Sequence, residues 1–304
     1  MNSTDKTYTV VSHDSGGAEL LSSYVKQKKL NCHYVLAGPA VTIFRKKLGH
    51  VEISDLEMAV ANSRVILCST SWQSDIEIDA ISYAHKLNKK SIAFLDHWVN
   101  YKDRFVRNGV LNLPNEIVVC DKAAMNIAKK TFPDISVKLI ANPYIQDLIE
   151  DFKKFQHSNL SCNLKANGIM LYVGENISGH AILRHGNGMY FGYTEETALT
   201  YFIKNIKKLD LEIREIKVRP HPSEEKDKYS AQLSTLPYKI STSVNSTLIE
   251  DIFEADVVVG CSSMALAIAS VLGKKVISSI PPSAKLPPWP YNNIVELRKV
   301  VGDH

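Results

Sequence analysis

The stretch ADVVVGCSSMALAIASVLGKKVIS, residues 255–278, contains a complete strand–helix–strand pattern. A valine-rich run at 256–260 is followed by a turn of small residues and by an apolar helical stretch at 264–272. A second strand is predicted at 275–279. Strands buried on both faces are continuously apolar, and parallel strands need a crossover connection, usually a helix. This stretch therefore predicts a parallel sheet covered by helices.

The same alternation of short apolar runs and longer amphipathic runs extends along the whole chain. Further strands are predicted at 8–12, 33–37, 65–69, 91–95, 117–120, 137–141, 169–173, 215–219 and 238–241. Further helices are predicted at 17–29, 41–48, 73–87, 122–131, 144–155, 194–209, 224–236, 246–253 and 292–300. Such alternation is typical of βαβ units.

The polar segment QHSNLSCNLKANG, which begins at residue 156, interrupts this alternation. We place a linker at 156–167, between an N-terminal domain of residues 1–156 and a C-terminal domain of residues 168–304. The expected fold class is α/β, with two Rossmann-like doubly wound domains that face a central cleft. Ligands in such folds bind beyond the carboxyl ends of the strands, so the residues that follow each strand are the site candidates.

The composition is that of a globular protein, because 45% of the 304 residues are hydrophobic and 22% are charged. The net charge of +4 is too mild to favour nucleic acid as a partner. No run approaches the ~18 apolar residues of a membrane helix, and the first residues lack a leader pattern. The five cysteines form no CxxC pair, which favours reduced thiols over a zinc site. We therefore expect a cytoplasmic protein.

The first candidate residues follow the strand predicted at 8–12. His13 and Asp14 stand where a general base could stand, and Gly16 and Gly17 leave bare amides at a helix start, which can hold an anion. The alternative is local: Asp14 caps the helix and His13 fills the turn. The acid–base pair beside two glycines favours the functional interpretation.

The segment DHWVNYKDRF, residues 96–105, follows the strand predicted at 91–95. It places Asp96 and His97 beside aromatic residues, a combination typical of a small-molecule site. The alternative is a buried Trp98 whose polar neighbours are satisfied locally. On the preceding helix, Asp75, Glu77 and Asp79 form only a weak metal pattern, and a solvated helix face is expected for them.

In the second half, Glu175 follows the strand predicted at 169–173 and could place a carboxylate in the cleft, although loop chemistry explains it equally well. The stretch after it contains His180, Arg184 and His185, matches no metal-site spacing, and is predicted to be an irregular loop.

Arg219 and His221 lie at the end of the strand predicted at 215–219, and prolines on both sides of His221 restrict its backbone. A cation and an imidazole held together suit a phosphate. Ser262 and Ser263 open the helix at 264–272, where amides and hydroxyls can bind phosphate. An ordinary serine cap is the alternative.

On the helix predicted at 246–253, Glu250 and Asp251 could reach a ribose. A solvated face is the preferred interpretation for both of them.

The segment RPHPSE at 219–224, followed about forty residues later by ADVVVGCSSMALAIASVLGKKVIS, resembles the C-terminal half of bacterial GT-B glycosyltransferases. The similarity is to the sialyltransferases, Kdo-transferases and glycerophosphotransferases of capsule and lipopolysaccharide synthesis. In those groups a His-Pro motif and a Ser-Ser motif hold the nucleotide phosphate. The resemblance thus implies that role for His221, Ser262 and Ser263, with Arg219 as a helper.

The resemblance implies a metal-independent enzyme that moves a sugar from a nucleotide-activated donor, such as a CMP-linked acidic sugar, to a surface-polysaccharide or glycolipid acceptor. The donor is a substrate, and no cofactor is implied. The acidic-acidic-Gly motif that carries the base in many sialyltransferases is missing here. Asp14 is therefore the expected base, with His13 or Asp96 as second choice.

Two alternatives remain open. One is a sugar-nucleotide epimerase or hydrolase of the same fold, and the other is a non-catalytic protein that binds a nucleotide or glycan. The basic segment FRKKL at 44–48 could touch an anionic membrane, although basic helix ends are common on soluble surfaces. The sequence leaves the oligomeric state open.

Overall fold

The computed structural model describes residues 7–71, 74–158, 168–221, 223–284 and 291–303. The chain divides into two compact units, Met1–Asp147 and Leu148–His304. Of the linker predicted at 156–167, residues 159–167 lie outside the described residues, and the residues before them end a helix, α6 (Pro143–Ser158).

The first unit contains a six-stranded sheet in the order β2-β1-β3-β4-β7-β8, with every pair parallel. The strands are β1 (Tyr8–Ser12), β2 (Cys32–Leu36), β3 (Val65–Cys68), β4 (Lys90–Phe94), β7 (Glu116–Val119) and β8 (Ser136–Leu139). The helices before α6 are α1 (Ser15–Lys28), α2 (Pro39–Leu48), α3 (Leu56–Ala61), α4 (Ile76–Lys86) and α5 (Lys122–Thr131). Two features were not predicted from the sequence: α3, and the short hairpin of β5 (Val106–Arg107) and β6 (Val110–Leu111).

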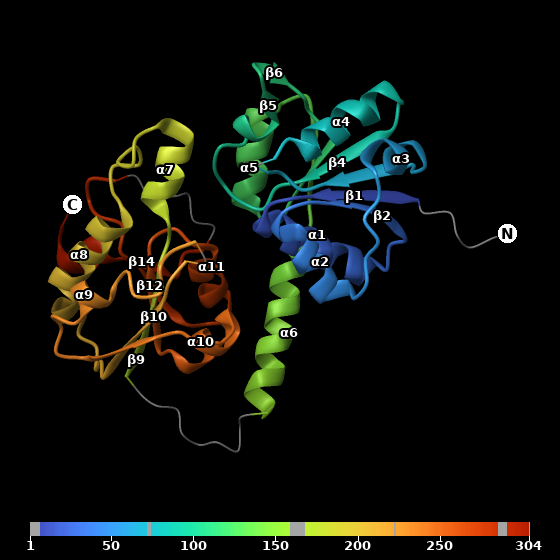
Figure 1. Cartoon of the computed structure of the whole chain (residues 1–304). Helices are drawn as coiled ribbons and strands as arrows, with labels where there is room; N and C mark the ends of the chain where they lie inside the picture. The colour runs from blue at the N-terminus through green and yellow to red at the C-terminus, as the bar shows by residue number, and fades with distance from the viewer. Residues whose placement is uncertain (1–6, 72–73, 159–167, 222, 285–290, 304) are drawn as a thin grey trace. The chain divides into compact units, whose positions relative to one another are not determined.

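Helices cover both faces of this first sheet, with α1 and α2 on one side and α3 and α4 on the other (Figure 1). The core on the α1 side joins Val10, Leu67 and Phe94 of the strands to Leu21 of α1 and Phe44 of α2. These side chains are at most 2% exposed, and Val11 and Ile66, which alternate with Val10 and Leu67, are 0% exposed. The strands are therefore buried on both faces, as their continuous apolar runs predict.

The second unit contains a six-stranded parallel sheet in the order β11-β10-β9-β12-β13-β14. In order of appearance this is 3-2-1-4-5-6, the order of dinucleotide-binding Rossmann domains. The strands are β9 (Ile169–Val173), β10 (Glu215–Arg219), β11 (Lys239–Thr242), β12 (Val257–Gly260), β13 (Lys275–Ser278) and β14 (Ile294–Glu296). The helices are α7 (Ile177–His185), α8 (Glu195–Asn205), α9 (Ser230–Leu233), α10 (Leu248–Glu254), α11 (Met264–Val271) and α12 (Leu297–Val301), and a 3-10 turn (Ile206–Leu209) follows α8.

Three predicted elements of the second unit were wrong. The expected loop around His180 begins with a helix, α7, because the side chain of Asn176 caps it by accepting the N–H of Gly179. The helix predicted at 224–236 shrinks to α9, and the helix predicted at 292–300 is divided into β14 and α12. In that last case pairing with β13 extends the sheet and outweighs the local helical pattern.

Candidate functional site

Each sheet reverses its strand order next to the first strand of its unit, and ligands bind at this point in open α/β sheets. In the first unit the reversal lies between β1 and β3, because β2 lies on the other side of β1. In the second unit it lies between β9 and β12, because β10 lies on the other side of β9. His13 and Asp14 follow β1, and Ser262 and Ser263 follow β12. Asp96 follows β4 and His221 follows β10, so all of these residues lie at the carboxyl edge of their own sheet.

His13 and Asp14 form a hydrogen-bonded pair at the carboxyl end of β1. Nδ1 of His13 lies 2.7 Å from Oδ1 of Asp14, and about four-fifths of each side chain is buried. Asp14 occupies the N-cap position of α1, but its side chain makes no capping hydrogen bond. The carboxylate is therefore directed to the imidazole, which is how a general base and its orienting acid are arranged.

Gly38 explains why the His13 ring can lie where it does. The φ angle of Gly38 is +53°, and a Cβ added there would come within 2.5 Å of Nε2 of His13. A side chain at this position would therefore be strained and would also displace the imidazole.

Gly16 and Gly17 let two side chains approach the first turn of α1. A Cβ on Gly16 would overlap with Oδ2 of Asp96, and a Cβ on Gly17 would lie 2.5 Å from Cβ of Ser69. Close packing therefore requires both glycines. The Asp96 carboxylate lies near a helix N-terminus, where negative charge is favoured. That these amides hold a ligand anion stays a prediction.

Asp96 and His97 are engaged in local contacts. Oδ1 of Asp96 accepts a hydrogen bond of 2.9 Å from Arg104, which is buried and also donates to Thr70. Nδ1 of His97 accepts the N–H of Trp98 at 3.0 Å. These contacts resemble the local alternative for this segment, in which polar neighbours of a buried tryptophan are satisfied by each other. A catalytic role for Asp96 or His97 stays a prediction.

Glu77, in the first turn of α4, differs from the expectation of a solvated helix face. Asp75 and Asp79 are exposed, as expected, but Glu77 is only 2% exposed. Its carboxylate accepts hydrogen bonds from residues that follow β1 and β3. The sequence could not show this, because the spacing of the three acids is also that of a surface helix.

In the second unit, the carboxylate of Glu175 lies at the start of α11. One oxygen accepts the N–H of Ser262 at 2.5 Å, and the other accepts the Ser262 hydroxyl at 2.8 Å. Ser263 caps the helix by accepting the N–H of Ala265 at 3.1 Å. Burial raises the pKa of Glu175 from 4.5 to about 7, although hydrogen bonds to Ser262 oppose the rise. The position predicted for a phosphate thus holds a carboxylate of the protein itself, and the pKa of this carboxylate is raised to about 7.

The raised pKa of Glu175 makes Glu175→Gln a test of this environment. Because the folded pKa of about 7 exceeds the usual 4.5, the carboxyl's contribution to stability is complete below about 4.5 and is lost as pH rises through about 7. Glutamine can keep both contacts with Ser262 and has no charge to bury. We expect the free energy of unfolding of the variant, relative to wild type, to rise by up to ~3 kcal/mol from about pH 5 to about pH 8.

Guanidinium titrations at the two pH values measure this difference, and exposed Glu212→Gln is the matched control. Parallel pH dependence of Glu175→Gln and wild type would show that Glu175 is not held in a desolvated site.

His221 lies in a tight loop after β10, and local contacts within this loop engage Nδ1 of its ring. Its N–H donates to Oε2 of Glu224 at 3.0 Å. The hydroxyl and the N–H of Ser223 both approach Nδ1, at 2.7 and 3.2 Å. A backbone N–H can only donate, so Nδ1 is an acceptor and the ring proton is on Nε2. Burial and the nearby His180 lower the pKa of His221, which favours a neutral ring that donates from Nε2. Pro222 lies outside the described residues.

The loop is supported by residues that the sequence analysis did not single out. The Glu224 carboxylate is almost fully buried and accepts hydrogen bonds from the Tyr229 hydroxyl at 2.7 Å and from Lys228 at 3.1 Å. Asn176 donates to Ser223 at 2.9 Å. The one signal in the sequence was Glu224, an acid three residues after a histidine at a strand end. Its partners, Lys228 and Tyr229, come from later turns of the chain.

Arg219 is held by Asp251, which corrects the expectation that Asp251 lies on a solvated face. Asp251 is 0% exposed and lies 2.6 Å from Arg219 and 2.8 Å from Lys217. The hydroxyls of Ser243 and Ser246 also donate to it. These cations and hydroxyls lower the pKa of Asp251 despite its burial. Part of the positive charge of Arg219 is therefore neutralised, while its place at the end of β10 is fixed.

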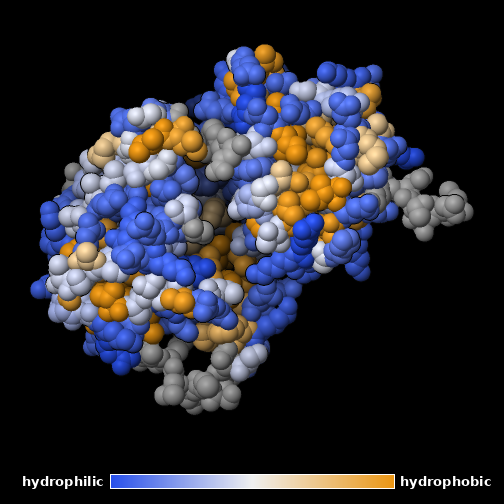
Figure 2. Space-filling model, in the orientation of Figure 1, coloured by the Kyte–Doolittle hydropathy of each residue, from blue (hydrophilic) through white to orange (hydrophobic). Residues whose placement is uncertain are grey.

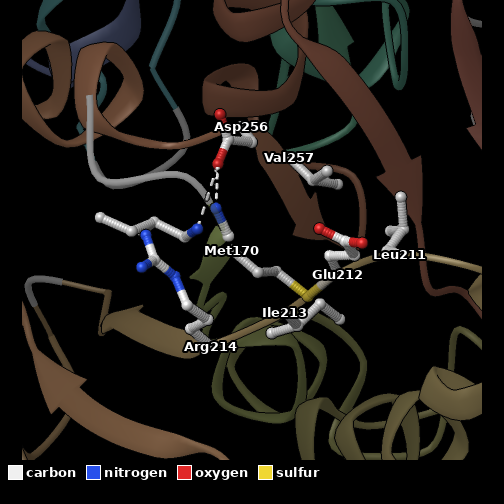
Figure 3. Close-up of a pocket in the computed structure, with 9 residues that line it drawn as sticks. Met170, Leu211, Glu212, Ile213, Arg214, Asp256 and Val257 are labelled. Carbon is white, nitrogen blue, oxygen red and sulfur yellow. Dashed lines mark hydrogen bonds between the residues drawn. The ribbon is translucent and has the colours of Figure 1, made fainter. Parts of the chain in front are cut away.

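A cavity of about 380 Å³ lies at the opposite edge of the second sheet, near the amino ends of β9, β10 and β12. Figure 3 shows Met170 reaching toward Glu212 and Ile213, with Asp256 bonded to the backbone of residues 168 and 169. Ligands of open α/β sheets bind at the carboxyl ends, so this cavity is not the candidate site.

The described residues contain no group of three or more His, Cys, Asp and Glu side chains arranged to hold a metal ion. No helix within the same ranges is long and apolar enough to cross a membrane.

The sequence matches no protein-family model and no curated protein. Solved structures do resemble the fold. A UDP-GlcNAc 2-epimerase from Neisseria meningitidis has a TM-score of 0.58 at 10% identity, over 90% of this chain and 82% of that one. A putative UDP-N-acetylglucosamine 2-epimerase from Listeria monocytogenes has a TM-score of 0.56 at 12% identity, over 90% of this chain and 79% of that one. The wall teichoic acid polymerase TagF has a TM-score of 0.50 at 14% identity, over 90% of this chain and 70% of that one. The chain therefore has the α/β fold of GT-B-type enzymes, with two parallel six-stranded sheets, as predicted.

Proposed function

We propose that the protein is a glycosyltransferase that moves a sugar from a nucleotide-activated donor to a surface-polysaccharide or glycolipid acceptor. The observation that carries the proposal is the loop of His221, whose Nε2–H has no hydrogen-bond partner among the described residues and which lies at the same sheet edge as the start of α11. Strands β10 and β12, which lead to His221 and Ser262, flank β9, so their ends lie about 10 Å apart. That separation suits a diphosphate or a phosphate with its sugar.

In the proposed reaction, the glycosidic oxygen of the donor leaves as part of a phosphate. His221 donates a hydrogen bond to it and Arg219 supplies positive charge. The amides and hydroxyls of Ser262 and Ser263 hold the remaining oxygens in place of the Glu175 carboxylate, to which Ser262 donates here. These groups are fixed before the reaction, so the transfer is proposed to need no metal and no cofactor. His13 and Asp14 take the proton of the acceptor hydroxyl as it attacks the sugar carbon.

A lipid-linked acceptor is supported by exposed side chains on α7 and the segment after it. Figure 2 shows hydrophobic side chains gathered over α7. The exposed members are Ile182, Leu183, Met189, Tyr190 and Phe191. A peripheral membrane contact near α7 or the basic segment 44–48, a cytoplasmic location and a CMP-linked acidic sugar as donor are parts of this proposal. The last of these rests on the sequence resemblance alone.

Calorimetric binding of CMP, CDP, UDP and GDP tests the phosphate site. One nucleotide should bind well to wild type and about 10–100-fold more weakly to His221→Ala, because a hydrogen bond to a charged group contributes about 1.5–3 kcal/mol. His85→Ala, which removes an exposed histidine on α4, should bind like wild type. If none of the four nucleotides binds, the transferase proposal fails and the non-catalytic alternative gains support.

A sugar-nucleotide epimerase or hydrolase is the second candidate, and Glu175 is the observation that favours it. A carboxyl with a pKa of about 7 beside the phosphate site can exchange a proton at neutral pH. Such an enzyme would consume or rearrange the donor without an acceptor, so donor turnover in the absence of acceptor distinguishes it from a transferase.

A further inference from the structure

One oxygen of Glu77 joins the two strand ends that surround the His13–Asp14 pair. Oε1 accepts the N–H of His13 at 2.9 Å, the hydroxyl of Ser69 at 2.9 Å and the hydroxyl of Ser71. All three donors lie within three residues of the carboxyl ends of β1 and β3. Glu77 itself belongs to α4, so a helix residue joins these two ends in addition to the sheet bond from the N–H of Ser69 to the carbonyl of Val11.

The contacts continue from Glu77 to both members of the pair. Ser71, which donates to Glu77, accepts the N–H of Asp14 at 3.2 Å. Glu77 thus reaches His13 directly through its backbone and Asp14 through one hydroxyl. These contacts hold the backbone at His13 and Asp14. The backbone conformation there determines whether Nδ1 of His13 can hydrogen-bond to Oδ1 of Asp14.

Burial of the Glu77 carboxyl costs folding free energy, so packing alone does not account for this residue. The residue is 2% exposed, and its second oxygen, Oε2, is buried without a hydrogen-bond partner among the described residues. Burial raises the pKa of Glu77, despite the hydrogen bonds from Ser69 and Ser71. A buried carboxyl with an unsatisfied oxygen destabilises a fold, and such costs are concentrated at functional sites.

We infer that Glu77 is a positioning residue that orients the His13–Asp14 pair for proton transfer. The catalytic consequence rests on the proposed function, whereas the orientation does not. Loss of the Glu77 oxygen frees the N–H of His13 and the hydroxyl of Ser71, so the turn at residues 13 and 14 relaxes and the imidazole leaves Asp14. Glutamine keeps an acceptor oxygen at the same place and preserves the orientation.

Nitrogen-15 NMR of the His13 ring tests the inference without any substrate, with the signals assigned by their loss in His13→Asn. In wild type and Glu77→Gln, Nδ1 should show the shift of a hydrogen-bonded N–H. In Glu77→Ala this signature should disappear. Asp79→Ala, an exposed acid on the same helix, should leave it unchanged. If Glu77→Ala retains the wild-type ring signals, the inference is overturned.

Ser71→Ala is the second variant if Glu77→Ala does not fold, because it removes only the link between Glu77 and Asp14. It should shift the amide signal of Asp14 and the ring signals of His13, and unchanged signals would overturn the inference. With an active donor, Glu77→Ala should lower kcat at least 10-fold at constant donor KM, and Glu77→Gln should stay within about 3-fold. If no nucleotide binds but the ring signals change as expected, the proposed function fails and the inference stands.

Discussion

Asp14→Asn is expected to lower kcat by ~10²–10⁴-fold, the usual contribution of a positioned acid or base. The carboxylate lies 2.7 Å from Nδ1 of His13, so asparagine removes the proton acceptor if Asp14 is the base. If His13 is the base, asparagine removes the negative charge that stabilises the protonated ring. The donor dissociation constant should stay within about 2-fold of wild type, because the phosphate-binding candidates belong to the other compact unit.

The measurement is steady-state transfer with the nucleotide donor identified by calorimetry. Asp134→Asn, which neutralises an exposed aspartate of the same unit, is the matched control and should retain wild-type kcat. Unchanged kcat in Asp14→Asn would remove the pair from the reaction and leave Asp96 as the remaining carboxylate candidate.

Asp251→Ala is expected to destabilise the second unit by about 3 kcal/mol, because truncation of a buried ion pair leaves its partners unpaired. Asp251 is fully buried, and both Arg219 and Lys217 lie within 2.8 Å of it. The estimate is at the lower end of the usual range because Arg219 keeps part of its surface in water and Lys217 retains Glu254. Release of Arg219 should also weaken nucleotide binding.

The sign of the pH dependence follows from the lowered pKa of Asp251. Its contribution to stability is present above the unfolded value of 3.8 and is lost as pH falls through the lower, folded value. The deficit of the variant should therefore be full at neutral pH and shrink in acid well below 3.8. Guanidinium titrations measure it, and Glu254→Ala, which removes the half-exposed partner of Lys217, should cost no more than about 1 kcal/mol. Equal costs for the two variants would contradict this account of Asp251.

The fold was predictable because, along most of the chain, the local sequence pattern favours the same element that the packed structure contains. The predicted strands at 8–12, 169–173 and 215–219 have the observed bounds, since β-branched apolar runs have few other ways to be buried. Prediction failed at Ile294–Glu296, where three residues pair with β13 inside a helical pattern. It also failed at α7, where glycine and histidine hide a helix that begins at a side-chain cap.

The candidate site was predictable where it depends on position along a strand, and not where it depends on a partner. His13, Glu175, His221 and Ser262 follow parallel strands, and parallel strands bring their carboxyl ends to one edge. The burial of Glu77 and Asp251 depends on hydroxyls, cations and a backbone N–H that lie up to 64 residues away in the chain. Acidic residues at helical spacing have the same sequence pattern whether they are buried beside such partners or exposed on a surface helix.

The sequence alone determined the α/β class, the parallel sheets and the strand ends where chemistry can occur, because the periods of apolar residues and the chain connections are local properties. Only the tertiary structure decided which charges are paired. It directed Asp14 to His13, placed Glu175 at the start of α11 and bound Arg219 to Asp251. Apart from the adjacent His13 and Asp14, these pairs join segments far apart in the chain, and their distances of about 3 Å arise only when the helices pack on their sheets.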